Sequence, residues 1–340
     1  MDDGDATDAQ DATLDRLDAA LLGGRPGLTL AALAEAAGVS ETFARSFWRS
    51  MGFPDATAET ATYTEKDVEA LRAVAALLAE DVLDERTAAS LLRALGHTND
   101  RLVLWETEAL VEDAVRRFDL DDTSARIVVL DRLPDVLDRL EELLRYGWRR
   151  QMAALAHRTH DDVALRHLDE SILDRLPLIR AIGFADMVSY TQLTASLGPQ
   201  QLAALVQSFE DTARDIVTGA GARVVKMIGD AVLYVADDLT TAARVALDLT
   251  DAIRALPSGL SLRSSLVWGR VLSRSGDVFG PTVNLASRLA DVATPGTVLM
   301  DRASAAALAT ADITGVSLVP QYPTEVEGVG IVTPVELRRA

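Results

Sequence analysis

Cysteine is absent from the 340-residue chain. Disulfides, thiolate metal sites and cysteine nucleophiles are therefore excluded, and this absence is typical of proteins from a reducing compartment. Long apolar runs are also missing, because no stretch approaches the roughly 20 residues that cross a bilayer. The N-terminal residues are acidic, whereas a secretion signal begins with basic ones. These features predict a cytoplasmic protein without a membrane span.

Lysine and histidine are scarce and unevenly placed. Of the 33 Lys and Arg residues only Lys66 and Lys226 are lysines, and the four histidines all lie in the first half of the chain. The second half therefore has neither a histidine base nor a histidine-based zinc site. It also lacks the G-x-x-x-x-G-K-[ST] phosphate loop and the G-x-G-x-x-G pattern, which excludes the two common glycine-rich nucleotide loops.

Negative charge is concentrated in the first half. The formal net charge is -19, of which -16 belongs to residues 1–170 and -3 to residues 171–340. Because contacts to phosphate depend on Lys and Arg, nucleic acid is an unfavourable partner for so acidic a segment. The nearly neutral second half remains suited to an anionic ligand.

The first half is predicted to be all-helical. Its apolar residues recur at a period near 3.6, and helix breaks are expected at Gly23-Gly24, Gly52-Phe53-Pro54, Gly96 and Pro134. A chain of this length suits two domains. The pattern predicts a helical domain over residues 1–170, with a linker helix at about 150–175.

The second half, residues 176–340, is predicted to be α+β. Segments such as AIGFADM and LRSSLVWGRVL are short, rich in Val, Ile and Leu, and separated by amphipathic helices. This alternation indicates a sheet covered by helices. The segment VVKMIGDAVLYV has apolar runs on both sides of Gly229 and Asp230, which predicts a tight hairpin and hence a mixed sheet.

Two carboxylates are placed at the ends of predicted strands. Asp186 follows the apolar run AIGFA, and Asp230 lies at the hairpin turn. Carboxylates without imidazole suit Mg²⁺ or Mn²⁺, and paired hard cations suit phosphoryl transfer. A single Asp at a strand end is more often a solvated turn residue. Lys226, in an apolar strand, is expected to be buried and to need an acceptor.

Three segments together resemble the signature blocks of class III nucleotide cyclases: FADMVSYT at 184–191, KMIGDA at 226–231 and DVFGPTVNLASR at 277–288. The resemblance covers about 178–310. It implies a ferredoxin-like mixed sheet covered by helices and the activity of an adenylyl cyclase, which converts ATP to cyclic AMP and pyrophosphate. The polar positions that match the family's spacing are Asp186, Lys226, Asp230, Asp277, Asn284 and Arg288.

The family's metal-binding and catalytic roles carry over to four of these positions and to the neighbouring Met187. The resemblance implies that Asp186 and Asp230 hold two divalent cations per site, Mg²⁺ or Mn²⁺, with the carbonyl of Met187 as a further ligand. It implies that Arg288 stabilises the charge that develops on the α-phosphate, and that Asn284 orients the ribose.

The resemblance also implies how ATP is recognised. Lys226 and Asp277 match the residues that select adenine, and Arg270 matches an arginine that contacts the terminal phosphates. A phosphate-binding lysine found after the third block in mammalian cyclases has no counterpart, so modest affinity for ATP is expected. In the family the metal aspartates of one subunit work with the remaining residues of the other, which implies a homodimer with two equivalent sites.

The arrangement of the two halves resembles actinobacterial cyclases with an autoinhibitory N-terminal domain, some of them responsive to pH. His157, His160 and His167 are spaced so that they can share one stripe of the linker helix. Unperturbed histidine titrates near pH 6.5, and acidic neighbours favour its charged form. The full-length protein is therefore expected to be more active in mild acid than at pH 8.

Two other interpretations remain open. The segment with predicted helix caps at Thr29 and Ser40, followed by residues 63–68, resembles the start of a MerR-type DNA-binding domain. The chain would then be a transcription regulator with a cyclase-like nucleotide-sensing domain, although the acidic charge argues against DNA. The third interpretation is a degenerate cyclase that only senses nucleotide, against which the complete set of site residues argues.

Overall fold

The computed structural model describes residues 3–55, 57, 60–167, 178–188, 197–256, 260–274, 276–311 and 313–340. The chain divides into two compact units, Met1–Ile172 and Leu173–Ala340. Within the described ranges, no helix combines the length and the apolar character that a membrane crossing requires.

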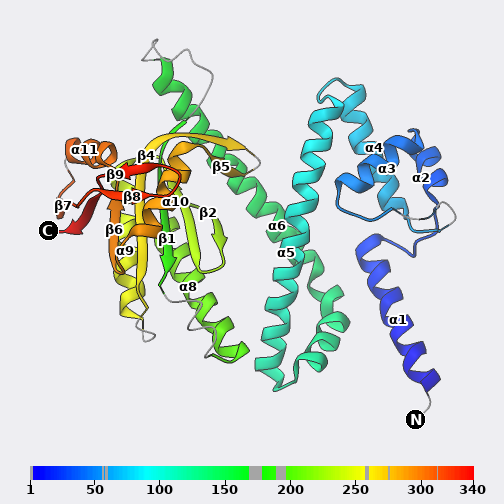
Figure 1. The fold of residues 1–340 in the computed structure, drawn as a ribbon. Helices are drawn as coiled ribbons and strands as arrows, with labels where there is room; N and C mark the ends of the chain where they lie inside the picture. Colours follow the sequence, from blue (N-terminus) through cyan, green and yellow to red (C-terminus); the bar gives the residue numbers. More distant parts are fainter. Residues whose placement is uncertain are drawn as a thin grey trace. The chain divides into compact units, whose positions relative to one another are not determined.

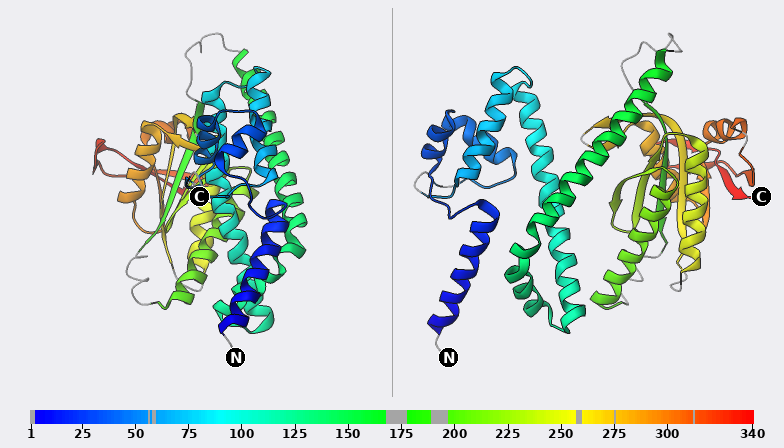
Figure 2. Two further views of the ribbon diagram at one scale, coloured as in Figure 1. Left: turned by 90° about the vertical axis from the view of Figure 1, so that its right-hand side faces the viewer. Right: turned by 180° about the vertical axis from the view of Figure 1, so that it is seen from behind.

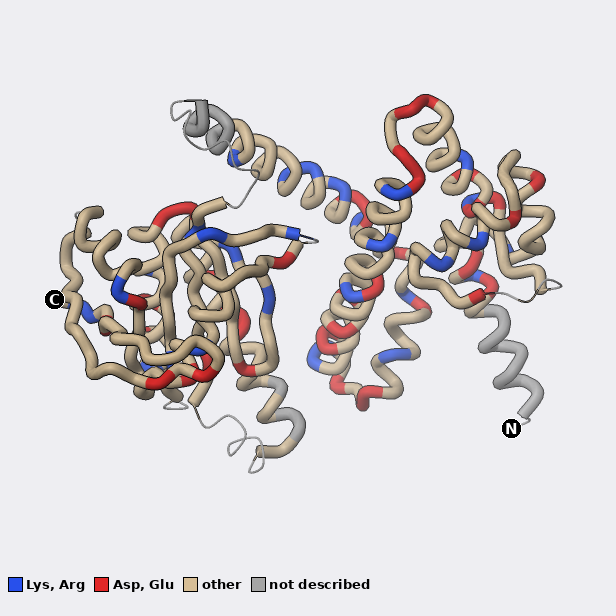
Figure 3. The backbone as a smooth tube through the Cα atoms, turned by 45° about the horizontal axis from the view of Figure 1, so that its top comes forward, with Lys and Arg blue, Asp and Glu red and all other residues tan. Residues whose placement is uncertain are grey.

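The N-terminal unit is helical, as the sequence predicts (Figure 1). The side-chain oxygens of Thr29 and Ser40 cap two of its helices by accepting the N–H groups of Ala32 and Phe43, at 3.3 and 3.2 Å. Its helices are α1 (Asp3–Leu22), α2 (Leu30–Ala37), α3 (Glu41–Ser50), α4 (Glu65–Ala79), α5 (Glu85–Phe118) and α6 (Asp122–His167). Charges of both signs are interspersed along α5 and α6 (Figure 3).

Of the four helix breaks predicted in this unit, those at Gly23-Gly24 and Gly52-Phe53-Pro54 are confirmed, because α1 ends at Leu22 and α3 ends at Ser50. The other two are wrong. Gly96 lies inside α5, and Pro134 lies inside α6. At Gly96 the missing side chain serves packing, because a Cβ there would lie 2.2 Å from the carbonyl oxygen of Met51. Pro134 lacks one N–H donor, but α6 has 46 residues and continues through it. Of the predicted linker helix, residues 168–175 lie outside the described residues.

The C-terminal unit is built on a mixed sheet. Its strand order is β2-β3-β1-β4-β6-β10-β7, with β5 paired to β4, and a separate hairpin is formed by β8 and β9. β4 and β6 are parallel, whereas β1 is antiparallel to both of its neighbours. The strands are β1 (Leu178–Met187), β2 (Arg223–Ile228), β3 (Ala231–Ala236), β4 (Leu262–Arg274), β5 (Asp277–Phe279), β6 (Thr297–Met300), β7 (Val316–Pro320), β8 (Thr324–Val326), β9 (Gly330–Val332) and β10 (Val335–Arg339).

Helices cover both faces of this sheet (Figure 2). Leu266 and Val267 are consecutive in β4, so their side chains point to opposite faces. Leu266 packs in a cluster with apolar residues of α8, α9 and α11, and Val267 packs against Leu289 of α10. The predicted α+β architecture is confirmed. The helices are α8 (Pro199–Gly219), α9 (Leu239–Ala255), α10 (Pro281–Val292) and α11 (Arg302–Thr310).

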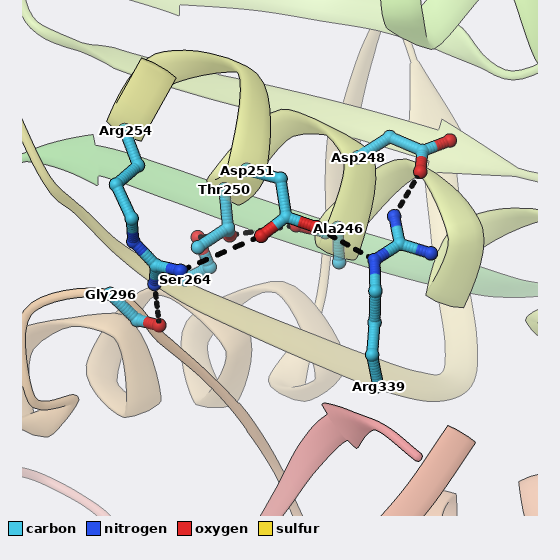
Figure 4. A network of polar contacts seen from close by, with 8 residues as sticks. All are labelled: Ala246, Asp248, Thr250, Asp251, Arg254, Ser264, Gly296 and Arg339. Carbon is cyan, nitrogen blue, oxygen red and sulfur yellow. Dashed lines mark hydrogen bonds and ion pairs between the residues drawn. The ribbon is translucent and has the colours of Figure 1, made fainter. Parts of the chain in front are cut away.

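Polar contacts attach α9 to β10 and to the residue that precedes β6 (Figure 4). Arg339 of β10 binds Asp248 and Asp251, the latter at 2.7 Å, and Arg254 donates to the carbonyl of Gly296 at 2.9 Å. Single exposed pairs contribute only about 0–1 kcal/mol each. Together, however, they fix the position of β10, the last strand in the sequence, relative to α9.

Candidate functional site

Asp186 and Asp230 come together at one end of β1 and β3. Asp186 is paired with Ala231 in the strand register, and the N–H of Met187 donates to the carbonyl of Asp230 at 3.0 Å. The hairpin turn between β2 and β3 is tight because Gly229 adopts a φ of +61°, which favours glycine. The predicted hairpin is confirmed, and it brings the two predicted metal aspartates close together.

The electrostatics of this carboxylate pair favour a cation. Burial raises the pKa of the Asp186 carboxyl to about 6, and the negative charge of Asp230 contributes to the rise. A bound cation would remove both penalties, because it favours the ionised forms. Within the described ranges, no group of three or more His, Cys, Asp or Glu side chains could hold a metal. The two carboxylates and the Met187 carbonyl nevertheless fit a hard divalent ion that takes its other ligands from substrate and water.

Arg263 is a charged neighbour of Asp186 that sequence reasoning missed. The two residues are direct partners in the register of β1 and β4, so their side chains leave the same face of the sheet, the face that α10 covers. The positive charge of Arg263 opposes the rise in the pKa of Asp186. Its Nε atom is buried and has no hydrogen-bond partner within the described residues. The sequence feature that could have indicated this role is an arginine at a strand position whose next alternate neighbours along β4 are buried.

Lys226 and Asp277 form an ion pair across 51 residues of sequence. Lys226 Nζ lies 2.6 Å from Asp277 Oδ2, and the N–H of Val278 donates to Asp277 Oδ1 at 2.8 Å. Burial works to raise the pKa of Asp277, but the hydrogen bonds from Lys226 and Val278 outweigh it and hold this pKa below its usual range. Lys226 therefore has the acceptor that the sequence predicts.

The predicted burial of Lys226 is wrong, because 42% of its side chain is exposed. The reason is topological. β2 is the first strand in the sheet order, so it has a neighbour on one side only. The Lys226–Asp277 pair therefore presents one donor and one acceptor group to an incoming ligand.

Asn284 and Arg288 are both exposed and lie one turn apart on α10. Arg288 Nη1 lies 3.2 Å from Asp291 Oδ2 and 3.9 Å from Glu327 Oε2. In the part of the chain that the structure describes, no ion pair joins Arg288 to Asp186 or Asp230, the two predicted metal ligands. Within one chain the predicted residues thus form three separate groups. These are Asp186 with Asp230, Lys226 with Asp277, and Asn284 with Arg288 on one face of α10.

Arg270 is exposed near the end of β4. Its carbonyl accepts a hydrogen bond from Thr282 Oγ1 at 2.7 Å, which joins this strand to the start of α10. Gly269 permits the close approach, because a Cβ there would lie 2.6 Å from the same hydroxyl oxygen. Arg270 and Asn284 therefore lie on elements that are fixed to each other.

The predicted regulatory histidines lie on one continuous helix, α6. His157 and His160 are exposed, and His167 is the last residue of that helix. The side chain of His167 lies outside the described residues. In the predicted DNA-reading helix, α3, Arg49 Nε is bound by Asp55 Oδ1 at 2.8 Å, so part of its positive charge is neutralised within the chain.

Comparisons with known proteins identify relatives over most of the chain. A family model described as the adenylate and guanylate cyclase catalytic domain matches residues 180–335. An adenylate cyclase of Glutamicibacter nicotianae is 41% identical over 332 residues, which cover 96% of this chain and 82% of the relative. An adenylate cyclase of Streptomyces coelicolor is 40% identical over 292 residues, 85% of this chain and 74% of the relative. A pH-sensitive adenylate cyclase of Mycobacterium tuberculosis is 36% identical over 119 residues, 35% of this chain and 30% of the relative.

Proposed function

Because the chain belongs to the adenylate and guanylate cyclase family, we propose that it is an adenylyl cyclase that converts ATP to 3′,5′-cyclic AMP and pyrophosphate. The observation that carries this proposal is the ion pair between Lys226 and Asp277, which offers the hydrogen-bonding pattern of an adenine site. Relatives named adenylate cyclase, 40 and 41% identical to this chain, support the same substrate.

Asp186, Asp230 and the Met187 carbonyl would hold the divalent cations, Mg²⁺ or Mn²⁺, two per site. When bound, these ions lower the pKa of the ribose 3′ hydroxyl and neutralise the triphosphate. The two carboxylates fix the position of this chemistry at the end of β1. Since histidine is absent from residues 171–340, no imidazole of this segment serves as the base.

Lys226 and Asp277 select the purine. The Lys226 ammonium donates to N1 of adenine, and the Asp277 carboxylate accepts from the 6-amino group. Guanine carries a carbonyl oxygen at position 6 and a proton on N1, so each contact would become unfavourable. A site built on hydrogen bonds rejects the wrong partner because the polar groups that the bound purine covers are then left unpaired.

Arg288, Asn284 and Arg270 act on the sugar and the phosphates. Arg288 stabilises the negative charge that increases on the α-phosphate as the 3′ oxygen attacks and pyrophosphate leaves. Asn284 orients the ribose, so that the 3′ oxygen is in line for that attack. Arg270 binds the terminal phosphates.

The sites are shared in a homodimer. Lys226, Arg270, Asn284 and Arg288 are all exposed in the single chain, as expected of residues that complete a partner's site. Exposed apolar side chains accompany them, because Ile179 pairs with Arg270 and Leu272 pairs with Phe279 in the strand registers. Exposed apolar residues gathered on neighbouring strands favour an interface between subunits.

The N-terminal helical unit regulates the catalytic unit, and pH is the proposed signal. Support comes from the exposed His157 and His160 on α6 and from the partial similarity to a relative named pH-sensitive. Several histidines that protonate together change the charge of one helix near neutral pH. The charged helix favours an active arrangement of the two subunits.

The decisive test is the formation of cyclic AMP from ATP by the purified full-length chain with Mn²⁺ or Mg²⁺. Cyclic AMP and pyrophosphate are expected in equal amounts, with little product from GTP. An Asp186→Asn variant of unchanged thermal stability is expected to lose the activity. A folded, dimeric wild-type protein that yields no cyclic AMP with either metal would contradict the proposal and favour a nucleotide-sensing role.

A further inference from the structure

Arg288 is held between two carboxylates of its own chain. Its Nη1 atom lies 3.2 Å from Asp291 Oδ2, three residues later on α10, and 3.9 Å from Glu327 Oε2. Glu327 follows directly after β8, in the turn of the β8–β9 hairpin. The residue before it, Val326, is buried in the same apolar cluster as Leu289 of α10. Packing of the hairpin against α10 therefore places the Glu327 carboxylate beside Arg288.

This contact is accessible and readily broken. The Arg288 side chain is 45% exposed, and that of Glu327 is 87% exposed. An exposed pair of this kind contributes little to folding stability. Two negative charges nevertheless surround one positive charge, so the local net charge is negative where the proposed function requires a cation for phosphate. An anionic substrate that reaches Arg288 must compete with both carboxylates.

We propose that Glu327, together with Asp291, forms an acidic clasp on Arg288 that competes with the triphosphate of ATP and sets the enzyme's affinity for nucleotide. The inference rests on the proposed function and adds to it a residue that determines affinity. The two arms of the clasp differ. Asp291 is on the same helix as Arg288, whereas Glu327 belongs to a separate hairpin and can leave Arg288 without any change in α10.

The first experiment compares Glu327→Gln with Glu325→Gln in the full-length chain. Glu325 is an exposed residue of β8, and no ion pair of its side chain occurs among the described residues, so it is a matched control for the lost charge. Glu327→Gln is expected to lower the KM for ATP about 3- to 10-fold while kcat changes less than about twofold. The control is expected to leave KM within about 1.5-fold of wild type. Equal KM values for wild type and Glu327→Gln would contradict the proposal that Glu327 competes with ATP for Arg288.

Salt separates an electrostatic clasp from a change in shape. Because ions screen exposed charges, the KM difference between wild type and Glu327→Gln is expected to shrink towards twofold or less between about 0.02 and 0.5 M salt. A difference that is independent of salt would contradict the proposal. Thermal unfolding checks that both variants keep the wild-type melting temperature, as expected from the exposure of their side chains.

A second experiment tests whether Glu327 acts through Arg288. 3′-Deoxy-ATP lacks the attacking hydroxyl, so its binding with Mn²⁺ can be measured by calorimetry without turnover. Glu327→Gln is expected to tighten this binding in the wild-type background and to have no effect in an Arg288→Ala background. An equal gain in both backgrounds would mean that Glu327 merely repels phosphate, and would overturn the clasp.

The two proposals fail in different ways. If wild type forms cyclic AMP but Glu327→Gln behaves like Glu325→Gln, the clasp is wrong and the proposed function stands. If wild type forms no cyclic AMP and 3′-deoxy-ATP does not bind, both are wrong.

Discussion

Asp186 on β1 and Arg263 on β4 are direct cross-strand partners, so a carboxylate and a guanidinium share one face of the sheet beside Asp230. Burial and the second carboxylate raise the pKa of Asp186, and the arginine lowers it. Arg263 thereby partly offsets the repulsion within the carboxylate pair. Because Arg263 is itself a cation, it is not expected to be a ligand of the predicted metal ions.

Metal binding is predicted to weaken in acid, because the pKa of Asp186 is raised to about 6. Below that pH the carboxyl is increasingly protonated, and a proton competes with the metal. Arg263→Met removes the opposing charge, so the pH at which half of the Mn²⁺ binding is lost is expected to rise by about half a unit to one unit. Electron paramagnetic resonance of Mn²⁺ between pH 5 and 8 measures this midpoint. Arg263→Lys is the control and is expected to keep the wild-type value; a midpoint unchanged by Arg263→Met would contradict the assigned role.

Shared sites predict complementation between inactive subunits. Asp186→Ala and Arg288→Ala are each expected to reduce kcat by at least about 100-fold, since each removes an essential charge. In an equal mixture, half of the dimers are mixed, and each mixed dimer has one intact site and one doubly defective site. Up to about a quarter of wild-type activity is therefore expected to return. The measurement is cyclic AMP formation after subunit exchange has been verified; a mixture as inactive as its components would exclude sites shared in this way.

Purine selection is predicted to depend on the Lys226–Asp277 pair. The double change Lys226→Glu with Asp277→Cys leaves adenine facing the wrong groups, at about 1 to 3 kcal/mol for each lost contact. The value of kcat/KM for ATP is therefore expected to fall by about 30-fold or more. Lys66→Glu, at the only other lysine of the chain, is a matched control because Lys66 lies in the N-terminal helical unit. Full ATP activity after the double change would remove both residues from the purine pocket.

Histidines of α6 are predicted to make the full-length enzyme more active at about pH 6 than at pH 8, measured with saturating Mn²⁺. The variant with His157, His160 and His167 all changed to Ala is expected to lose most of this difference. His97→Ala, on α5, is expected to retain it. If the triple variant keeps the wild-type profile, these histidines are not the sensor.

Those features of the fold that depend on residues close together in the sequence could be predicted. The caps at Thr29 and Ser40 and the hairpin turn at Gly229 depend on residues only a few positions apart, and all three are confirmed. The closeness of Asp186 and Asp230 follows from that hairpin and from the pairing of its second strand with β1.

Features that depend on distant partners were not predictable. Gly96 looks like a helix break until Met51 is seen against it. Arg263 can be assigned to the side of Asp186 only when the register of β1 and β4 is known. Glu327 reaches Arg288 because Val326 and Leu289 share one apolar cluster, and neither residue reveals this in the sequence.

The Lys226–Asp277 pair lies on β2, at one end of the strand order, and on the short β5, and the Lys226 side chain is 42% exposed. Asp186, by contrast, alternates along β1 with the fully buried Ala185 and Met187. Substitutions at Lys226 and Asp277 are therefore expected to disturb folding little, whereas changes around Asp186 are expected to alter the core as well. Under the proposed roles, nucleotide preference is therefore expected to be the more evolvable property of this scaffold, while the metal chemistry is constrained together with the fold.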